Sequence, residues 1–492
     1  MNSMLLLTPI AAPLLAVLVY AGAGWRRATA HAGTAAAVLI LAAGITLAVR
    51  VTRHGPLDTA GGWLRADPLA AFMLLGIGTI ATIACAASPS YLATAGHGAT
   101  SGSPRRYGLL VQCFLAAMST AVLAGNLGLA WIAIEATTIV TAFLVGHAGT
   151  RAALEAAWKY TVLCSVGIAL ALLGLVLLYD AARHAGLTEA DALNLPTLAA
   201  HARALDPAVV RMAAAFLLLG FGAKAGLAPL HAWLPDAHGQ APAPVSALMS
   251  GVLLPVAFSQ ILRIKTVVDT VVGVAFTRIM LLVLGLATLA LAALLLVAQR
   301  DYKRMLAYSS MEHMGLIAVG AAIGTPLAIT AILLHIAGHG LAKAVAFTAS
   351  GHLYATEHTT RLDRVTGLAR RNPALAAIFA AAILALLGFP PFSLFASELA
   401  LARAGFAAHL GIAIAAALVL TLLAFASLAR HTAAMLLGDG PPTPSPAPTA
   451  NPASLSLASR TPLILGLATV AALGITAWPI NTLLHLAAQA GH

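Results

Sequence analysis

The stretch GAKAGLAPLHAWLPDAHGQAPAPVSALMSG, residues 222–251, follows an apolar run and holds four prolines. A proline inside a helix removes a backbone hydrogen bond and breaks the helix. At membrane depth, such a break is tolerated only where protein or water satisfies the freed backbone groups. A second stretch, LALLGFPPFSLFASELALARAG at residues 384–405, combines a proline pair with apolar flanks. The two stretches predict two interrupted helices in a chain that lies within a membrane.

The composition of the whole chain supports this interpretation. Of the 492 residues, 60% are hydrophobic and 9% are charged, and the mean hydropathy is +0.93. Apolar runs of about 20 residues, long enough to cross a bilayer, recur along the chain. The first run is interpreted as a retained helix and not as a signal peptide, because no basic residue precedes it. The sequence therefore predicts an all-α polytopic membrane protein.

About fourteen transmembrane helices are expected. Their expected spans are 4–22, 30–50, 67–87, 107–124, 126–147, 152–180, 209–232, 242–264, 270–298, 304–325, 326–355, 373–404, 408–437 and 460–486. The seventh and twelfth helices are the broken ones, and two breaks five helices apart are typical of two five-helix repeats. Because each repeat has an odd number of helices, the repeats must be inverted. The expected units are N-terminal helices 1–3 in 1–106, helices 4–8 in 107–265, helices 9–13 in 266–437, a Pro-rich linker in 438–459 and a last helix in 460–492.

The net charge of +11 is explained by membrane topology and does not indicate nucleic-acid binding. Basic residues gather in the loops that follow odd-numbered helices, for example at 26–27, 105–106 and 370–371. Short loops rich in lysine and arginine stay in the cytoplasm. We therefore expect a multi-pass protein of the bacterial inner (plasma) membrane with both termini in the periplasm.

The three cysteines, Cys85, Cys113 and Cys164, lie far apart inside apolar runs, without CxxC or CxxH spacing. They are interpreted as small core residues. The sequence shows no ligand set for an iron–sulfur cluster, haem or zinc, and no GxGxxG or P-loop motif. We therefore expect this chain to bind no cofactor or metal and to carry out no redox chemistry itself.

Ionisable residues are rare in the apolar spans, and a charge at a helix centre costs at least about 2.5–3.5 kcal/mol on insertion scales. Three of them, His335, His339 and Lys343, follow one another at intervals of four residues. On a helix, that spacing keeps all three on one face over about 12 Å. The complete set of candidate functional residues is Glu135, Lys159, Lys224, His231, Glu312, His313, His335, His339, Lys343 and Glu398.

These residue types favour a path for protons. Desolvation favours the neutral form of a buried lysine, whereas a nearby carboxylate favours the charged form. If Glu135 approaches Lys224, its movement switches the proton affinity of the lysine. The two histidines before Lys343 can relay protons near neutral pH. Lys343 is then the central carrier, and Glu398 is the exit group.

Several candidates also have a structural interpretation. Lys159 stands four residues after Glu155, so it is equally well explained as a salt-bridged lysine at the membrane surface. Glu312 and His313 lie near the expected cytoplasmic turn DYKRMLAYSS and would then simply be hydrated. His231 would cap the carbonyl groups that the helix break sets free.

Three motifs resemble those of a known family. KAGLAPLHAWLPDAHGQAPAPVSALMSG (224–251), DYKRMLAYSSMEHMG (301–315) and LLHIAGHGLAKAVAFTASG (333–351) resemble the signatures of the proton-translocating antiporter-like subunits of respiratory complex I and of the Mrp antiporters. The resemblance covers nearly the whole chain. Within this family, the text at 129–147 and 155–179 is similar to the hydrogenase-4 component F group.

The resemblance implies fourteen helices in two inverted repeats, a Glu–Lys pair formed by Glu135 and Lys224, and a hydrated axis that contains the two histidines before the central Lys343. It also implies a terminal ion-carrying residue on helix 12, here Glu398. One feature departs from many relatives, which carry Lys or His in the middle of helix 8. The expected link between Lys224 and Lys343 therefore needs water or one of three other side chains, which are Ser250, Ser259 and Lys159.

The expected function is a non-catalytic, proton-translocating subunit of a hydrogenase-4 or formate hydrogenlyase-type complex. The resemblance implies that [NiFe] and iron–sulfur centres lie in partner subunits, in a peripheral redox arm that drives protons through this chain and its neighbouring membrane subunits. Three alternatives remain at this point. The chain would serve in an NADH-quinone oxidoreductase or an Mrp-type cation/proton antiporter, act as the membrane partner of a zinc protein in inorganic carbon accumulation, or work alone as a secondary transporter.

Overall fold

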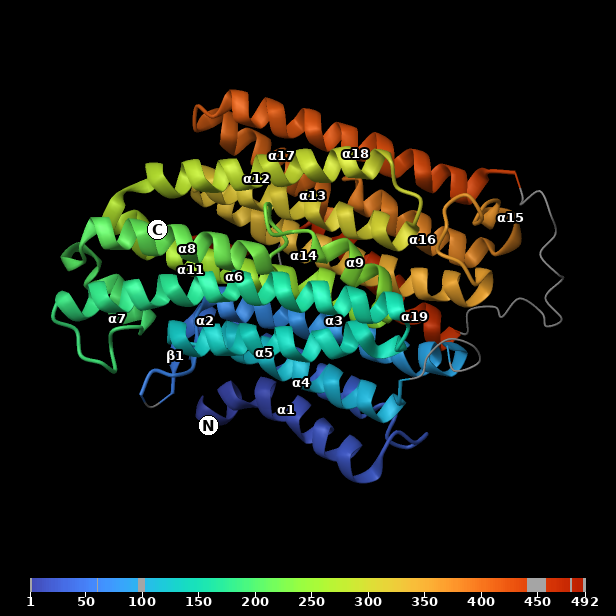
Figure 1. Ribbon diagram of the computed structural model, residues 1–492, viewed down its shortest axis with the longest axis horizontal. Helices are drawn as coiled ribbons and strands as arrows, with labels where there is room; N and C mark the ends of the chain where they lie inside the picture. Colours follow the sequence, from blue (N-terminus) through green and yellow to red (C-terminus); the bar gives the residue numbers. More distant parts are fainter. Residues whose placement is uncertain (1, 60, 96–101, 440–456, 478–479, 490–492) are drawn as a thin grey trace.

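The computed structural model describes residues 2–59, 61–95, 102–439, 457–477 and 480–489. These residues form an elongated bundle of helices that run roughly side by side (Figure 1). A short antiparallel hairpin, β1 (Leu57–Asp58) and β2 (Arg65–Ala66), lies at one end of the bundle. The prediction of an all-α membrane protein is confirmed by this helical architecture.

The helices have the following bounds. The first group is α1 (Asn2–Ala23), α2 (Ala32–His54), α3 (Pro68–Ala95), α4 (Pro104–Leu123), α5 (Leu127–Val145), η1 (Gly146–Ala148), α6 (Arg151–His184), α7 (Leu195–Ala200) and η2 (Ala202–Ala204). The second group is α8 (Pro207–Lys224), α9 (Trp233–Gln240), α10 (Ala243–Leu248), η3 (Met249–Leu253), α11 (Leu254–Val272), α12 (Val274–Val297) and α13 (Tyr302–Ile323). The third group is α14 (Pro326–Glu357), α15 (Leu368–Arg371), α16 (Pro373–Leu386), α17 (Ser393–Ala407), α18 (Gly411–Leu437), α19 (Leu457–Ile475) and α20 (Asn481–Gln489).

Eleven helical spans within the described residues are long and apolar enough to cross a membrane. They are α1 to α6, α8, the continuous run α10–η3–α11, α12, α14 and α18. Helix α13 is not among them and carries Glu312 and His313 in its middle. The pair α16 and α17 is divided by a break, and α19 is short. The count of fourteen, the inversion of the repeats and the limits of the five units stay predictions.

Both predicted helix breaks are confirmed. α8 ends at Lys224 and α9 begins at Trp233, while α16 ends at Leu386 and α17 begins at Ser393. In the first break Gly226 has a φ of +80°, and in the second Gly388 has a φ of +66°. Glycine adopts this left-handed conformation without the steric cost that a Cβ brings. Each break therefore depends on a glycine as well as on its prolines.

A further irregularity was not predicted from the sequence. The expected helix 242–264 contains a π-helical turn, η3, between α10 and α11. Gly251 in this turn packs so closely on α14 that an added Cβ would lie 2.8 Å from the carbonyl oxygen of Gly340. Single π-turns inside α-helices are often found at functional sites. Here the turn brings the backbones of two central helices together.

The expected last helix, 460–486, was wrong as one continuous span. The structure has α19 up to Ile475 and a separate α20 from Asn481. Pro479 lies between them in the sequence, and a proline cannot continue the hydrogen bonding of a helix. Most of the predicted Pro-rich linker, residues 440–456, lies outside the described residues.

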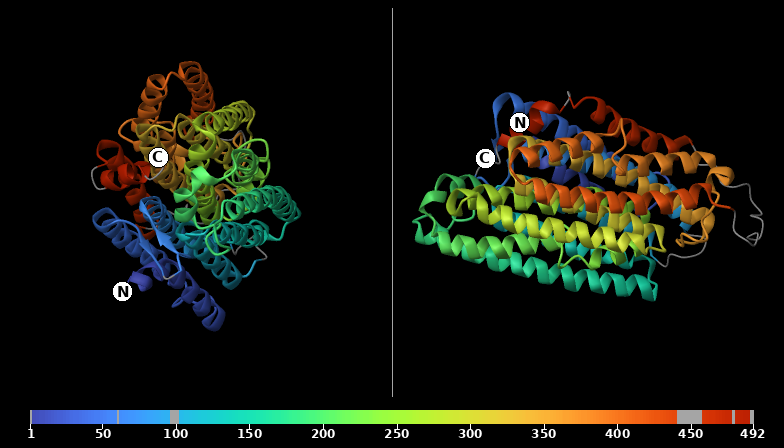
Figure 2. Two further views of the ribbon diagram at one scale, coloured as in Figure 1. Left: turned by 90° about the vertical axis from the view of Figure 1, so that its left-hand side faces the viewer. Right: turned by 90° about the horizontal axis from the view of Figure 1, so that it is seen from above.

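Two elements occupy the centre of the bundle. In the most apolar window of α10–η3–α11 all residues are buried, and in that of α14 83% are, whereas in α18 only 28% are. The end-on view in Figure 2 shows the N-terminal helices (blue) and the orange helices α17 and α18 on opposite flanks, with α19 and α20 (red) beside the N-terminal helices. The central α14 begins at a cap, because the Thr325 side chain accepts a hydrogen bond from Ala328 N. Because most of α14 is buried, its polar residues lie in the interior of the protein.

Candidate functional site

Lys224 is the last residue of α8, and its side chain is fully buried. Its Nζ donates hydrogen bonds to Thr138 Oγ1 on α5, at 2.8 Å, and to Tyr160 Oη on α6, at 2.6 Å. The same Nζ lies 4.8 Å from the centre of the Tyr160 ring, within the range of a cation–π interaction. No carboxylate lies within 4.0 Å of this amine among the described residues.

The expected ion pair between Glu135 and Lys224 is therefore not present. Glu135 Oε1 accepts a hydrogen bond from Ser165 Oγ at 3.4 Å, and its Oε2 is buried without a partner. Thr138 stands three residues after Glu135 on α5, on the same face of the helix. The hydroxyl of Thr138 accepts the hydrogen bond of Lys224 that the sequence assigned to the carboxylate.

The predicted row on α14 is confirmed as a geometric feature. The side chains of His335, His339 and Lys343 are all fully buried and lie on one continuous helix. Lys343 Nζ donates to the carbonyl oxygen of Leu306 at 2.8 Å and makes a short hydrogen bond to Ser309 Oγ, both on α13.

The two buried lysines share one arrangement. In the first half, the lysine donates to Thr138, three residues from Glu135 on the same helix. In the second half, the lysine donates to Ser309, three residues from Glu312 on the same helix. A hydroxyl group both donates and accepts a hydrogen bond. Each lysine therefore has a hydroxyl, and not a carboxylate, as its polar neighbour on the acidic helix.

Three histidines gather where α13, α14 and α17 meet. His313 Nδ1 and His335 Nε2 are 3.0 Å apart, and His335 Nδ1 is 2.9 Å from Ser397 Oγ. The rings of His313 and His339 have centroids 4.9 Å apart. Donor atoms of His313, His335 and Glu398 all lie within 4.8 Å of one another. In the described part of the chain, this is the group of His, Cys, Asp and Glu residues with spacing suited to a metal ion.

Glu398 lies in α17, shortly after the second break. A Cβ added to Gly388 would lie only 2.6 Å from Glu398 Oε2, so the carboxylate occupies the room that this glycine leaves. Ser309, Glu312 and Glu398 line one small cavity of about 10 Å³. A volume of about 10–15 Å³ is the least that holds one water molecule. The cavity brings the hydroxyl next to Lys343 and two carboxylates to one place.

His238 is a buried polar residue that the sequence analysis did not select. It lies on α9, just after the first break, and neither ring nitrogen has a hydrogen-bond partner. Its ring stacks on Phe347 at 5.2 Å, and Phe347 is one turn along α14 from Lys343. The signal for it was a histidine in the motif DAHGQAPAP, which begins between the expected helices 209–232 and 242–264.

Of the serines named as a link between the two halves, Ser250 makes an inter-helix contact and Ser259 does not. Ser250 Oγ on η3 lies 2.7 Å from Ser310 Oγ on α13. Ser259 Oγ donates to Val256 O on its own helix.

The structure places Lys159 away from the buried axis. Its side chain is 47% exposed, and its Nζ lies 2.7 Å from Glu155 and 3.2 Å from Asp236. Asp236 also binds Arg304, at 2.5 Å. These four residues line a cavity of about 200 Å³ at one end of the bundle. The salt bridge considered for Lys159 is therefore present, and it belongs to a network that joins α6, α9 and α13.

The other structural alternatives concern His231 and the pair Glu312 and His313. His231 is half-buried in the break between α8 and α9, and its Nδ1 has no hydrogen-bond partner in the described residues, so its role as a helix cap stays a prediction. Glu312 and His313 are only 5% and 1% exposed. The interpretation that these two are simply hydrated was therefore wrong, because α13 runs into the interior of the bundle.

Comparisons with known proteins agree with this architecture. The profile of the family described as "NADH:quinone oxidoreductase/Mrp antiporter, TM" matches residues 124–424. A hydrogenase-4 component F homolog from Methylacidiphilum infernorum is 40% identical over 305 residues, which are 62% of this chain and 64% of that protein. NADH-quinone oxidoreductase subunit N from Desulforudis audaxviator is 32% identical over 73% of this chain and 71% of its own. In the structure of the Mrp complex from Dietzia sp., one chain shares the fold with a TM-score of 0.85 and 24% identity, over 99% of this chain and 97% of that chain.

Proposed function

Because the chain belongs to the NADH:quinone oxidoreductase/Mrp antiporter transmembrane family, we propose that it is a proton-translocating membrane subunit of a hydrogenase-4-type complex. The 40% identity to the component F homolog supports this branch of the family. In this proposal, other membrane subunits and a peripheral arm with [NiFe] and iron–sulfur centres supply the redox energy. The complex lies in the bacterial inner membrane, with both termini of this chain in the periplasm.

The observation that carries the proposal is the state of the two central lysines. Lys224 and Lys343 are both 0% exposed, and neither has a carboxylate partner within 4.0 Å in the described residues. By contrast, Lys265 pairs with Asp269. A buried charge without a counter-ion is expensive. An amine in this position is explained if it takes up and releases a proton during its function.

The neighbours of Lys343 provide a continuous path. Ser309 connects the amine to the cavity that Glu312 and Glu398 share. On the other side, the linked pair of His313 and His335 ends at Ser397, next to Glu398. Imidazole and hydroxyl groups both accept and donate protons. In this proposal a proton reaches Glu398 from the lysine through Ser309 and the cavity, whereas a transfer to the histidine pair has to pass His339, whose ring nitrogens have no hydrogen-bond partner in the described residues.

We propose that His238 takes part in the connection between the two halves. It follows the break that Lys224 precedes, and it packs against Phe347 on α14. Its two unpartnered nitrogens leave it free to exchange a proton with water on either side. In this proposal, His238 serves in place of the Lys or His that helix 8 lacks.

The test uses inside-out vesicles from bacterial membranes that contain the whole complex, with acidification and electron transfer measured together. Lys224→Met and Lys343→Met keep side-chain length but cannot carry a proton, and we expect each to abolish acidification. Arg211→Met, at an exposed position on α8, is the matched control and should acidify normally. Acidification at the wild-type rate in both lysine variants, with the complex assembled, would refute the proposal.

A further inference from the structure

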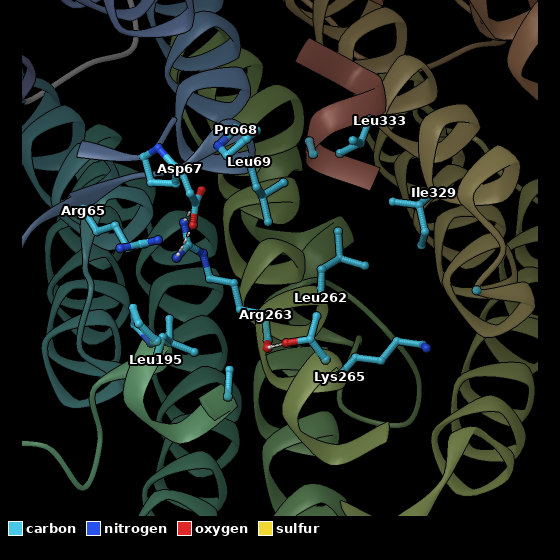
Figure 3. Close-up of a pocket in the computed structure, with 16 residues that line it drawn as sticks. Arg65, Asp67, Pro68, Leu69, Leu195, Leu262, Arg263, Lys265, Ile329 and Leu333 are labelled. Atoms are coloured by element: carbon cyan, nitrogen blue, oxygen red, sulfur yellow. Dashed lines mark hydrogen bonds and ion pairs between the residues drawn. The ribbon is translucent and has the colours of Figure 1, made fainter. Parts of the chain in front are cut away.

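Two cavities follow one another between α3, α11 and α14, away from the buried axis. The first, the polar cavity, has a volume of about 200 Å³ and is lined by Arg65, Asp67, Arg263 and Lys265 beside several aliphatic side chains. Figure 3 shows Arg65, Asp67 and Arg263 on one side of the cavity and Leu333 and Ile329 of α14 on the other, with the Lys265 side chain reaching toward the side of Ile329. The second, the apolar cavity, has a volume of about 560 Å³ and extends between α2, α3, η3, α14 and α19.

The polar cavity presents charged groups of both signs. Arg65 pairs with Asp58 at 2.7 Å, and Arg263 pairs with Asp67 at 3.2 Å. Arg263 is only 7% exposed. Its Nε is buried and has no hydrogen-bond partner. A buried donor without an acceptor costs about 1–3 kcal/mol. A ligand in the polar cavity that carries a hydrogen-bond acceptor would therefore satisfy the Nε of Arg263.

The threonines that line the apolar cavity on α3 and α19 do not present their hydroxyl protons to a ligand or to water. Thr79 donates its hydroxyl to Leu75 O, and Thr469 donates to Leu465 O, each on its own helix. The remaining walls are chiefly aliphatic side chains and glycines. Cavities of this kind stay dry. At Gly76 an added Cβ would meet nothing within 4 Å, because it would point into this empty space.

The two cavities lie one after the other along α3 and α14. Leu69 lines the polar cavity, and Phe72, one turn further along α3, lines the apolar one. On α14, Leu333 lines the polar cavity, and Ile336, one turn further along, lines the apolar cavity. From Leu69 to Ile80 the helix advances about 16 Å, close to the thickness of one leaflet of the hydrocarbon core, which is about 15 Å.

The polar cavity lies where helices end, as a lipid headgroup requires. α3 begins at Pro68, and Gly324, which follows α13, belongs to the lining. The apolar cavity is walled mainly by apolar side chains of α2, α3, α14 and α19 and by the backbone of η3. A slender, flexible chain is the kind of molecule that fits.

We infer that the two cavities bind one phosphatidylethanolamine molecule, with its headgroup in the polar cavity and one acyl chain in the apolar cavity. The phosphate provides the acceptor that Arg263 Nε lacks. The ammonium group of the lipid suits the carboxylate of Asp67, which lines the polar cavity. The acyl chain packs against Gly251 and Val252 of η3, next to the close contact between η3 and α14.

The test uses native membranes with the chain in its complex and a phosphatidylethanolamine that carries a diazirine in the middle of one acyl chain. After illumination, the labelled residues are mapped by mass spectrometry. We expect label on residues 72–80 of α3 and 465–473 of α19 well above the level on the outward face of α6. Gly76→Phe fills the cavity and should lower this label by an order of magnitude or more. Gly22→Phe, where an added Cβ also meets nothing, is the matched control and should leave the label unchanged.

A second variant tests the headgroup. Arg65→Gln should reduce labelling by the phosphatidylethanolamine probe, but not by an uncharged diacylglycerol with the same photoreactive chain. Label on α3 that is no higher than on α6, or that Gly76→Phe leaves unchanged, would overturn the inference. Label that appears only after the chain is purified away from its complex would also overturn it, since a neighbouring subunit would then fill the space. Proton translocation is not measured, so the result is independent of the proposed function.

Discussion

Replacement of Ser309 by alanine removes the hydroxyl that stands between Lys343 and the acidic residue of α13. The amine then keeps one of its two hydrogen-bond partners, the carbonyl oxygen of Leu306 at 2.8 Å. A hydrogen bond to a charged group contributes about 1.5–3 kcal/mol. Each 1.36 kcal/mol added to a barrier slows the step tenfold. If the hydroxyl carries the proton, Ser309→Ala slows translocation by about 10- to 150-fold.

The assay compares protons moved with electrons transferred in inside-out vesicles that contain the whole complex. Ser309→Thr keeps the hydroxyl and should restore most of the rate. The matched control is Ser350→Ala, because Ser350 is also fully buried, on α14, but donates only to Phe347 O of its own helix. This variant loses a similar hydrogen bond without touching the lysine.

Equal proton-to-electron ratios in Ser309→Ala and Ser350→Ala would refute the role of the hydroxyl. Failure of Ser309→Thr to recover activity, with the complex intact, would show that packing at this position matters and that proton transfer through it does not.

Three further variants test other parts of the axis. Lys343→Arg should be milder than Lys343→Ala in vesicle acidification, because arginine keeps the charge but does not easily release a proton; wild-type rates in both would remove this residue from the path. His238→Gln keeps a polar side chain that cannot relay a proton and should uncouple electron transfer from acidification, whereas unchanged coupling would exclude a link at this position. Gly388→Ala forces a Cβ into the space of the Glu398 carboxylate and should lose acidification and about 1–2 kcal/mol of stability. Gly24→Ala, with a similar φ of +69° but nothing within 4 Å, should show the loss of stability alone, measured by thermal unfolding, and a loss of acidification there would point to backbone strain as the cause.

Much of the fold is predictable because it depends on local sequence. Prolines and glycines decide where helices break, so both interruptions were found from the motifs at 222–251 and 384–405. The spacing of four residues placed His335, His339 and Lys343 on one buried face of α14. These properties follow from the geometry of a single helix and do not depend on its neighbours.

The contacts between helices were harder to predict from the sequence. The sequence gives no register between α5 and α8, so it could not show that Lys224 meets Thr138 before it reaches Glu135. His238 was missed for a related reason: its burial comes from packing on Phe347, more than a hundred positions later in the chain. The π-turn η3 likewise depends on the close approach of Gly340.

The separation of the lysines from the glutamates has a physical consequence for a proton carrier. A buried ion pair in direct contact holds its proton strongly, because loss of one charge leaves the other unpaired at a cost of about 3–5 kcal/mol. In rate terms this is a factor of about 10² to 5 × 10³ for every transfer. A hydroxyl between the two groups weakens that attraction and still provides a hydrogen-bonded route. Ser309, which shares a cavity with Glu312, occupies this intermediate position, and Thr138 is the hydroxyl next to Lys224, three residues from Glu135 on α5. A carboxylate introduced there, as in Ser309→Asp, should therefore bind the proton of Lys343 too tightly and stop translocation while the complex still assembles, and proton movement at the wild-type rate in that variant would contradict the argument.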